Sequence, residues 1–579
     1  MILLNPNARQ RTYDDGTTDD IMRKTIAFFE SKGKVRLKSD DRERVWYADF
    51  LAFQKENQIF AQLLTPSNYA GSAGCRWDTN RNCEFNEILG FYGLPYWYTW
   101  QVTILGLGPI WISDNDAVKR ATAEHLRQGG IFGFGLSEKT HGADIYSTGV
   151  RLEPQADGTY LANGNKYYIG NGNEAALLST LGKIVPAGAE STEKYADFAF
   201  FVNTTTHEAY KLIKNVVNSQ SYVAEYRLED YPITEAEILS KGRDAWDMAL
   251  NTVNIGKYNL GWASIGICTH AFYEAINHAA GRNLYGKYVT DFPHVKRLFV
   301  DAYCRLVSMK AFALRTKDYI RSASAEDRRY LLYTPLVKMK VTTQGEEVID
   351  NLWDVIAAKG FEKDMYFDMA TRDIRALPKL EGTVAVNMAL VVKFMQNYFF
   401  NPGQFNHVPV AEAPVNDDFL FNQGPTKGLG NTQFHDYNIA YDSVDLPNVN
   451  VFQEQIALFK QFMLVSMSDP RAVERQARDI DFLLTMGEIF SLVAYGQLII
   501  EFAQTSDDVD DDLLDLIFDV MVRDFSKFAL QLHSKPTCTD AQSTAGLAMI
   551  RKSVFDAAGY DKVWTEQVYA LRDVYEMRP

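Results

Sequence analysis

Cysteines and long hydrophobic runs are both scarce in this sequence of 579 residues. The five cysteines are odd in number and scattered, which argues against a disulfide framework or a zinc site and fits a reducing, cytoplasmic setting. The longest apolar stretches, 102–112 and 489–500, are shorter than the roughly 20 residues that cross a bilayer, so we expect buried cores and no stable membrane insertion. Asn5 and Pro6 interrupt the apolar start, so we expect no signal peptide.

Basic charge and several catalytic motifs are also lacking. Lysine and arginine number 59 against 74 aspartates and glutamates, and the net charge of −15 argues against a nucleic-acid partner. The nine histidines form no HxxxH or HxxEH pattern, so no metal site is expected. The absence of GxSxG argues against a serine hydrolase, and the absence of GxGxxG after a strand argues against a nicotinamide-binding domain.

The sequence does contain clear helical and strand patterns. Its hydrophobic content of 46% and aromatic content of 13% describe a folded chain that is too long for one core. Apolar residues recur at helical spacing on both sides of a strand-like stretch, which predicts an α+β fold that is mainly α. The predicted parts are an N-terminal arm (1–18), an N-terminal helical domain (19–130), a central β domain (131–240), a helical bundle domain (241–400), a linker (401–450) and an additional C-terminal helical domain (451–579).

Local signals place several boundaries. The run 114–116 offers a helix cap, and Gly129 with Gly130 ends that helix. Asp157-Gly158 and Asn163-Gly164 predict hairpin turns, so the β domain should be mostly antiparallel. The acidic run 506–512 predicts a solvated loop.

Four short stretches carry possible chemistry, at 134–144, 163–172, 282–287 and 371–383. In the last, Glu381 follows an apolar Ala-Leu-Pro-Lys-Leu run and precedes Gly-Thr. Apolar surroundings raise the pKa of a carboxyl group, which suits a general base, although an isolated glutamate is more often a solvated side chain at a loop–helix junction. In this order, over roughly residues 20–400, the four stretches resemble the acyl-CoA dehydrogenase family of flavoproteins.

The resemblance implies an FAD site. Arg282 would reach the FAD diphosphate of a neighbouring subunit, which suits a planar cation, although by residue type alone a favourable charge at a helix C-terminus is the better explanation. Asp354 corresponds to a position that often contacts FAD across a subunit interface and is also explained by a structural role. The full set of implied cofactor residues is Phe134, Leu136, Ser137, Tyr168, Ile169, Gly170, Arg282, Tyr285, Asp354, Ala358 and Thr383.

The resemblance also implies the chemistry. Glu381 matches the base that removes the α-proton of an acyl thioester, and its backbone N–H would help to polarise the thioester carbonyl. Gly382 and Ala143 fall at substrate-contacting positions. Some family members carry the base earlier in the chain, but the corresponding residue is Asn251, which cannot accept the proton.

Several positions depart from the family pattern. Tyr168 replaces a tryptophan beside the flavin, and Gly170 replaces a hydroxyl residue that would bond to flavin N5. Since one lost hydrogen bond is worth on the order of 1 kcal/mol, these changes imply altered redox tuning, an unusual electron acceptor or weak FAD retention. The remaining departures are Ala143 for a serine, Ala357-Ala358 for two glycines, and Ala385 for a glutamine.

The sequence therefore predicts an oxidoreductase of fatty acid metabolism that converts an acyl-CoA to the trans-2-enoyl-CoA. Electron-transfer flavoprotein or oxygen would accept the electrons, and the latter case would make it an acyl-CoA oxidase. The block 451–579 resembles the extension of the family's long-chain dehydrogenase and acyl-CoA oxidase branches, which implies a homodimer. A non-catalytic family subunit that supports a partner is the alternative from another class.

Overall fold

The computed structural model describes residues 2–9, 11–13, 15–190, 195–467 and 469–579. The chain divides into two compact units, which we describe separately. Unit 1 contains 1–10, 260–411 and 428–576, and unit 2 contains 11–259, 412–427 and 577–579.

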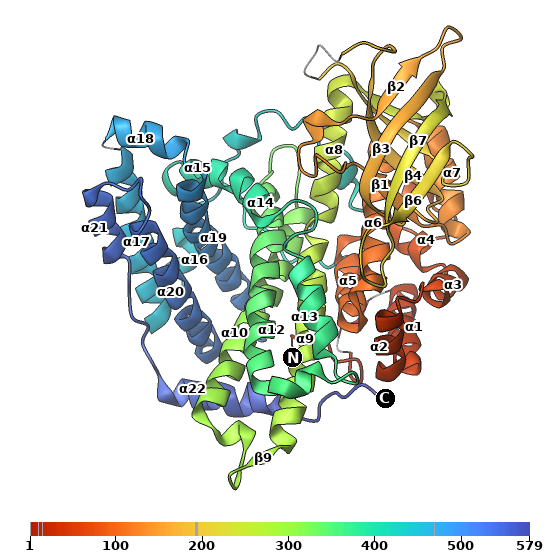
Figure 1. The fold of residues 1–579 in the computed structure, drawn as a ribbon. Helices are drawn as coiled ribbons and strands as arrows, with labels where there is room; N and C mark the ends of the chain where they lie inside the picture. Colours follow the sequence, from red (N-terminus) through yellow and green to blue (C-terminus); the bar gives the residue numbers. More distant parts are fainter. Residues whose placement is uncertain (1, 10, 14, 191–194, 468) are drawn as a thin grey trace. The chain divides into compact units, whose positions relative to one another are not determined.

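Unit 2 combines helices with one sheet. Asn115 caps α7 by accepting a 3.1 Å bond from the Val118 N–H, and Gly129 follows the helix with a φ of 81°, as the sequence predicted. Helix α6 packs against strands β1 and β4, and α8 packs against β5. The helices of unit 2 are α1 Gly16–Lys32, α2 Lys34–Glu43, α3 Ala48–Glu56, α4 Ile59–Leu64, α5 Thr79–Tyr92, α6 Leu94–Ile112, α7 Asp116–Arg127 and α8 Gly242–Gly256 (Figure 1).

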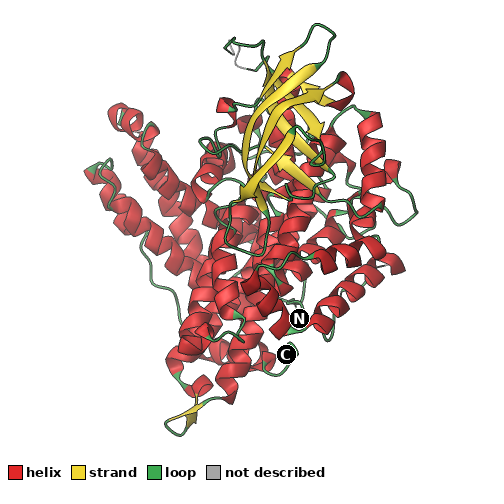
Figure 2. Cartoon of the chain, turned by 45° about the vertical axis from the view of Figure 1, so that its right-hand side comes forward, coloured by secondary structure: helices red, strands yellow, loops and turns green. Residues whose placement is uncertain are grey.

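The strands of unit 2 form a single eight-stranded sheet (Figure 2). Its order is β6-β7-β3-β2-β4-β5-β8, and β1 pairs in parallel with β4. Apart from the parallel pairs β1–β4 and β2–β4, the pairing is antiparallel, as predicted. The strands are β1 Phe132–Gly135, β2 Arg151–Pro154, β3 Tyr160–Gly170, β4 Leu177–Ile184, β5 Phe198–Asn203, β6 Tyr210–Asn215, β7 Val223–Ile233 and β8 Ile238–Lys241.

One predicted hairpin turn is wrong. Asn163-Gly164 lies inside β3, at a register shift against β7, because both strands continue past it. Gly164 is needed there for a close approach, since a Cβ would lie 2.8 Å from the Cα of Val150. Asn163 and Asp230 exchange hydrogen bonds of 2.8 and 2.9 Å across the bulge.

Unit 1 is helical apart from one short hairpin. The hairpin strands are β9 Asn283–Leu284 and β10 Lys287–Tyr288, and a π-helical turn, Val337–Val341, joins α11 to α12. The helices are α9 Asn259–Gly281, α10 Pro293–Arg321, α11 Tyr330–Leu336, α12 Thr342–Ile356, α13 Phe367–Ala376, α14 Val384–Val391, α15 Met395–Phe400, α16 Asn438–Tyr441, α17 Pro447–Met467, α18 Pro470–Ala477, α19 Ile480–Ala503, α20 Asp511–His533, α21 Asp540–Ala548 and α22 Ala557–Val563.

The acidic run near 506–512 is only partly a loop. Asp510 caps α20 by accepting a 2.9 Å bond from the Leu513 N–H, so the last two aspartates belong to the helix. Negative side chains are stabilised at a helix N-terminus, and the sequence prediction missed this preference.

Helix α19 is long and apolar enough to cross a membrane. It has 24 residues, and 83% of its most apolar window is buried inside the protein. Its Glu501 bonds to Arg315 on α10 at 2.9 Å. The apolar run 489–500 is therefore part of a buried core, as expected. The helix that contains it, α19, is longer than the run itself.

Candidate functional site

Glu381 lies in a tight turn before α14. The residue has a φ of 54° and Gly382 a φ of 84°, so two successive residues are in the left-handed region. Thr383 then caps α14 by accepting a 3.4 Å bond from the Val386 N–H. The Glu381 side chain is half-buried and its Oε2 atom is inaccessible to solvent. The turn therefore holds one oxygen of this carboxylate away from bulk water.

A buried lysine fastens this turn. Lys338 comes from the π-helical turn and is fully buried. Its Nζ donates to the carbonyls of Pro378 and Gly382, both at 2.6 Å. Asn387 adds a 3.2 Å bond to the same Gly382 carbonyl. Since Pro378 and Gly382 lie on either side of Glu381, Lys338 fixes both ends of the segment that carries the carboxylate.

The stretches 134–144 and 163–172, which the sequence analysis singled out, lie side by side at the ends of β1 and β3 in unit 2. Ser137 Oγ donates to the Tyr167 carbonyl at 2.7 Å, and the Tyr167 N–H donates to the Ser137 carbonyl at 3.0 Å. The Ser137 hydroxyl proton is thus used within the protein, while its oxygen keeps the capacity to accept. Phe134 stacks on Phe200 with centroids 6.0 Å apart.

A buried ion pair supports this corner. Lys166 is fully buried and bonds to Glu138 Oε1 at 2.8 Å and to the Leu136 carbonyl at 3.1 Å. Burial opposes ionisation of Glu138, but Lys166 and the bonds from Thr148 and Gly149 outweigh it and lower the pKa of the carboxyl group. Leu136 and the following turn are therefore held by a charged interaction in the interior.

Tyr168 projects from a bulge between these motifs. It has a φ of 64°, and its side chain is 58% exposed. The neighbouring Ile169 points the other way, into the core of the sheet, so only its backbone is available to a ligand. An exposed ring beside open backbone can lie against a planar ligand.

The stretch 282–287 contains most of the hairpin β9–β10. Tyr285 and Gly286 occupy its turn with φ values of 54° and 77°, which is the pattern of a type I′ turn. Tyr285 is 97% exposed and Arg282 is also exposed. Burial and the charges of Arg282 and Lys359 lower the pKa of His278, against the opposing charges of Glu362 and Glu274, and Lys359 is paired with Glu362.

The turn after α12 keeps a glycine-like conformation without glycine. Ala357 has a φ of 54° and a ψ of −137°, a combination that L-residues rarely adopt. Ala358 follows with an exposed side chain, and Asp354 is exposed on the last turn of α12. Ala357 therefore occupies a backbone conformation that glycine adopts without strain.

Strained backbone coincides with the motifs. Within the described residues, nine non-glycine residues have positive φ, and Tyr168, Tyr285, Ala357 and Glu381 are four of them. Such strain tends to persist at ligand-binding and catalytic positions. The exposed Tyr168 ring in unit 2 and the exposed Arg282 in unit 1 are each chemically suited to contact a flavin dinucleotide.

The remaining residues considered in the sequence analysis lie in ordinary structural surroundings. Asn251 is buried and its Nδ2 donates to the Gly424 carbonyl at 2.8 Å, so this alternative position holds a structural amide. Ala143 is exposed in the turn after Glu138. Among the described residues, no cluster of histidine, cysteine, aspartate or glutamate is arranged to hold a metal ion.

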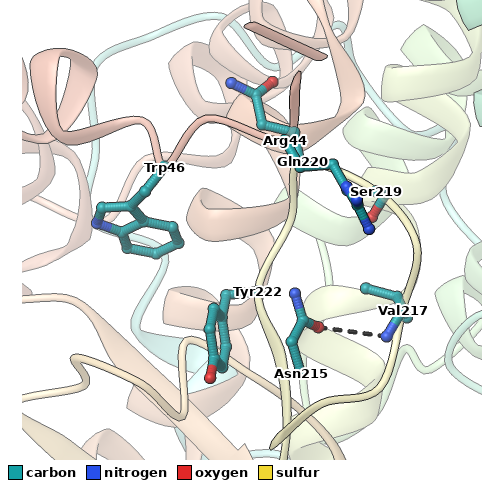
Figure 3. Close-up of a pocket in the computed structure, with 7 residues that line it drawn as sticks. All are labelled: Arg44, Trp46, Asn215, Val217, Ser219, Gln220 and Tyr222. Atoms are coloured by element: carbon teal, nitrogen blue, oxygen red, sulfur yellow. Dashed lines mark hydrogen bonds between the residues drawn. The ribbon is translucent and has the colours of Figure 1, made fainter. Parts of the chain in front are cut away.

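A separate hollow of about 380 Å³ lies between the α2–α3 turn and the β6–β7 hairpin (Figure 3). Trp46 and Tyr222 face each other edge to face with centroids 6.3 Å apart. Asn215 Oδ1 accepts from the Val217 N–H at 3.2 Å. None of the predicted site residues lines this hollow.

The sequence is similar to that of known acyl-CoA dehydrogenases. Residues 244–396 match the family model for the acyl-CoA dehydrogenase C-terminal domain. A probable short/branched chain specific acyl-CoA dehydrogenase of Dictyostelium discoideum is 22% identical over 45% of this chain and 62% of its own length. The very long-chain specific acyl-CoA dehydrogenase of Rattus norvegicus is 22% identical over 62% of this chain and 54% of its own length.

One solved structure shares the whole fold. The Bacillus anthracis acyl-CoA dehydrogenase, solved with FAD, superposes with a TM-score of 0.73 at 15% identity, covering 99% of this chain and 97% of that one. The sequence matches, by contrast, span between about half and two thirds of the two curated relatives. The additional C-terminal helices thus have a counterpart in a known structure.

Proposed function

We propose that this chain, whose residues 244–396 match the acyl-CoA dehydrogenase C-terminal domain, belongs to that family and is an FAD-dependent oxidoreductase that converts an acyl-CoA thioester to the trans-2-enoyl-CoA. The observation that carries the proposal is the strained Glu381–Gly382 turn, fixed by a buried lysine. A chain that had lost catalysis would have no reason to keep a carboxylate in a costly backbone conformation.

Glu381 is the proposed base. Its carboxylate takes the proton from the α-carbon, the C–H electron pair forms the new double bond, and a hydride leaves the β-carbon. FAD, when bound, supplies the acceptor for that hydride. The backbone N–H of Glu381 donates to the thioester carbonyl, which lowers the pKa of the α-proton and stabilises the developing negative charge.

The proposed FAD contacts follow from the family resemblance, and each unit is considered by itself. In unit 2, Tyr168 offers its exposed ring, and the backbone near Ile169 offers polar groups. In unit 1, Thr383 and the Ala357–Ala358 turn are proposed contacts, with Asp354 beside them. The rigid Glu138–Lys166 pair keeps the Leu136–Ser137 turn in position.

Arg282 and Tyr285 are assigned to the FAD of a neighbouring copy in a homodimer. The support is their position on an exposed hairpin, where Tyr285 is almost fully accessible and Lys359 adds a second cation. A diphosphate is the ligand that such a planar cation recognises well. The cytoplasm is the proposed location.

The electron acceptor is proposed to be an electron-transfer flavoprotein, with oxygen as the alternative. The decisive experiment adds acyl-CoAs of graded chain length to the purified protein without oxygen and follows the flavin absorbance. Bleaching by one length class supports the dehydrogenase, and peroxide formation on exposure to air identifies an oxidase. A colourless protein that takes up no added FAD contradicts the proposal and favours the non-catalytic subunit.

A further inference from the structure

The hollow in Figure 3 has two walls that are bonded to each other within unit 2. One wall is the turn 44–46 between α2 and α3, and the other runs from the end of β6 to the start of β7, 215–222. Gln220 Nε2 donates to the Val45 carbonyl at 2.8 Å, and Arg44 Nη1 donates to Asn218 Oδ1 at 2.7 Å. Because hydrogen bonds join both walls, the hollow of about 380 Å³ is formed before any ligand arrives.

Asn215 shapes the wall between β6 and β7. Its Oδ1 accepts from the Val217 N–H at 3.2 Å and from the Val223 N–H at 3.1 Å. Its Nδ2 donates to the Ser221 carbonyl at 3.2 Å. This amide is therefore used to fold the loop, so the groups that recognise a ligand must come from other lining side chains.

Two aromatic rings form the apolar part of the hollow. Trp46 and Tyr222 are both half-buried and lie on the same side of it, with ring planes at 88° (Figure 3). Trp46 also packs on the buried Tyr47 with centroids 4.2 Å apart, which supports the indole from behind. Aromatic rings that are fixed and partly exposed can pack against a flat ligand.

The hollow is lined by one positive side chain and no negative one. None of its seven lining residues is an aspartate or a glutamate, although the chain carries 74 of these residues and a net charge of −15. Arg44 is the cation. A guanidinium group has five N–H donors, and the bond to Asn218 uses one of them. The lining therefore favours an anion over a cation.

Arg44 lines the hollow from a strained backbone conformation. It ends α2 with a φ of 55° and a ψ of 42°, in the left-handed region. Its N–H donates to the Asp41 carbonyl at 3.1 Å, and the Val45 N–H donates to the Asp40 carbonyl at 2.8 Å. Glycine is the usual residue at such a helix end. Strain of this kind tends to persist where the side chain has a binding role.

We propose that this hollow binds a planar aromatic anion, whose ring lies against Trp46 and Tyr222 and whose carboxylate or phosphate group bonds to Arg44. Arginine binds either group through paired N–H donors. Two kinds of compound share this chemistry, aryl carboxylates and nucleoside monophosphates. The inference is independent of the proposed function, because no residue assigned to FAD or to proton removal lines the hollow.

The test is calorimetric titration of the full-length protein, loaded with its cofactor, with AMP and with indole-3-acetate in separate runs. Adenosine and indole are the neutral counterparts. We expect at least one anion to bind with a Kd below about 1 mM, and its neutral counterpart to bind at least about tenfold more weakly. The anion that binds more tightly identifies phosphate or carboxylate as the preferred group.

Variants then locate the binding. Arg44→Gln should weaken binding of the anion at least about tenfold and leave the neutral compound unchanged, whereas Trp46→Leu should weaken both. Arg44→Lys keeps the charge and should bind the anion more tightly than Arg44→Gln. Arg42→Gln is the matched control, because Arg42 is an exposed cation on the same helix that pairs with Glu43 at 3.2 Å and does not line the hollow.

Two results would overturn this inference. One is the absence of saturable binding of either anion up to about 5 mM. The other is an equal loss of affinity in Arg44→Gln and Arg42→Gln, which would place the anion elsewhere on the protein. Either result leaves the proposed function untouched, since flavin reduction by acyl-CoA is measured separately.

Discussion

Glu381, Tyr168, Tyr285 and Ala357 all hold positive φ angles, which cost L-residues about 1 kcal/mol or more each. At Glu381 the cost is offset by the two hydrogen bonds from Lys338 to the carbonyls on either side. Among the interactions described for the Ala357 turn, no buried side chain donates such hydrogen bonds. The cost of the strained backbone at Ala357 should therefore appear in the free energy of unfolding.

Ala357→Gly should stabilise the protein by about 1 kcal/mol, because glycine adopts this backbone without strain. The free energy of unfolding in urea measures the effect. Ala358→Gly is the matched control, since position 358 has no positive φ and glycine there only adds freedom to the unfolded chain. Equal destabilisation by both changes would contradict the strain at 357.

Lys338→Met should lower stability by about 2 kcal/mol, because it leaves the Pro378 carbonyl buried without its donor. It should also slow flavin reduction by acyl-CoA at least tenfold, because the turn that carries Glu381 loses its position. Stopped-flow absorbance without oxygen measures that rate.

Lys340→Met is the control for this change. Lys340 is also buried in the π-helical turn, but burial lowers the pKa of its ammonium group and Asp524 and Glu488 are the charges near it. This variant should lose stability and keep the rate of reduction. If the two variants slow reduction equally, Lys338 has no special role in positioning Glu381.

At the scale of elements, a buried polar network joins α10, α19 and the irregular stretch 401–437. Glu501 on α19 bonds to Arg315 Nε at 2.9 Å and to His435 Nε2 at 3.1 Å. Arg315 also donates to the Val408 carbonyl at 2.7 Å, and Tyr319 bonds to Glu501 at 3.0 Å. This network holds a segment that has almost no secondary structure of its own.

The network predicts a pH dependence of stability. Burial would raise the pKa of Glu501, but the bond from His435 and the charge of Arg315 outweigh it and hold the pKa at about 2. A carboxyl group with a depressed folded pKa stabilises the protein above its unfolded pKa of about 4.5, and this stability is lost as pH falls toward 2. The contribution is up to about 3 kcal/mol.

Urea unfolding between pH 6 and pH 3 tests this. Glu501→Gln should flatten the fall of the unfolding free energy with decreasing pH. Glu474→Gln, which removes an exposed partner of Arg478, should leave the slope unchanged. If the unfolding free energy falls equally steeply with decreasing pH in both variants, Glu501 does not cause the pH dependence.

Elements with local signals could be predicted from sequence, and those decided by distant contacts could not. The cap at Asn115 is local and was confirmed. The proline- and glycine-rich stretch after 401 is irregular up to α16, and α17 begins at Pro447, before the expected end of the linker at 450. Asn163-Gly164 has the composition of a turn, but pairing with β7 along its whole length kept it in a strand.

The same distinction applies to the candidate site. Glu381 was predicted from its motif, whereas Lys338 is one of two lysines in an apolar π-helical turn, and its partners lie 40 and 44 residues later.

At the scale of the whole molecule, the proposal involves a second copy of the chain. Arg282 is assigned to the FAD of the neighbouring copy. The assignment to another copy is the part of the proposal that only an assembly can test.

Mixed dimers of Arg282→Ala and Glu381→Gln should recover activity that each variant alone lacks. If Arg282 serves the neighbour, one site of the mixed dimer contains both an intact Glu381 and an intact Arg282. Co-expression with two different tags, followed by sequential purification, isolates the mixed dimer for an acyl-CoA dehydrogenation assay. No recovery, with FAD bound in only one subunit, would mean that Arg282 acts within its own chain.

The central claim is that Glu381 removes the α-proton. The most direct measurement is the rate of flavin bleaching after anaerobic mixing of acyl-CoA with Glu381→Gln, whose side chain keeps the size of glutamate and cannot take the proton. We predict normal FAD and acyl-CoA binding with bleaching slowed by at least about a thousandfold. Bleaching at the unmodified rate would contradict the account.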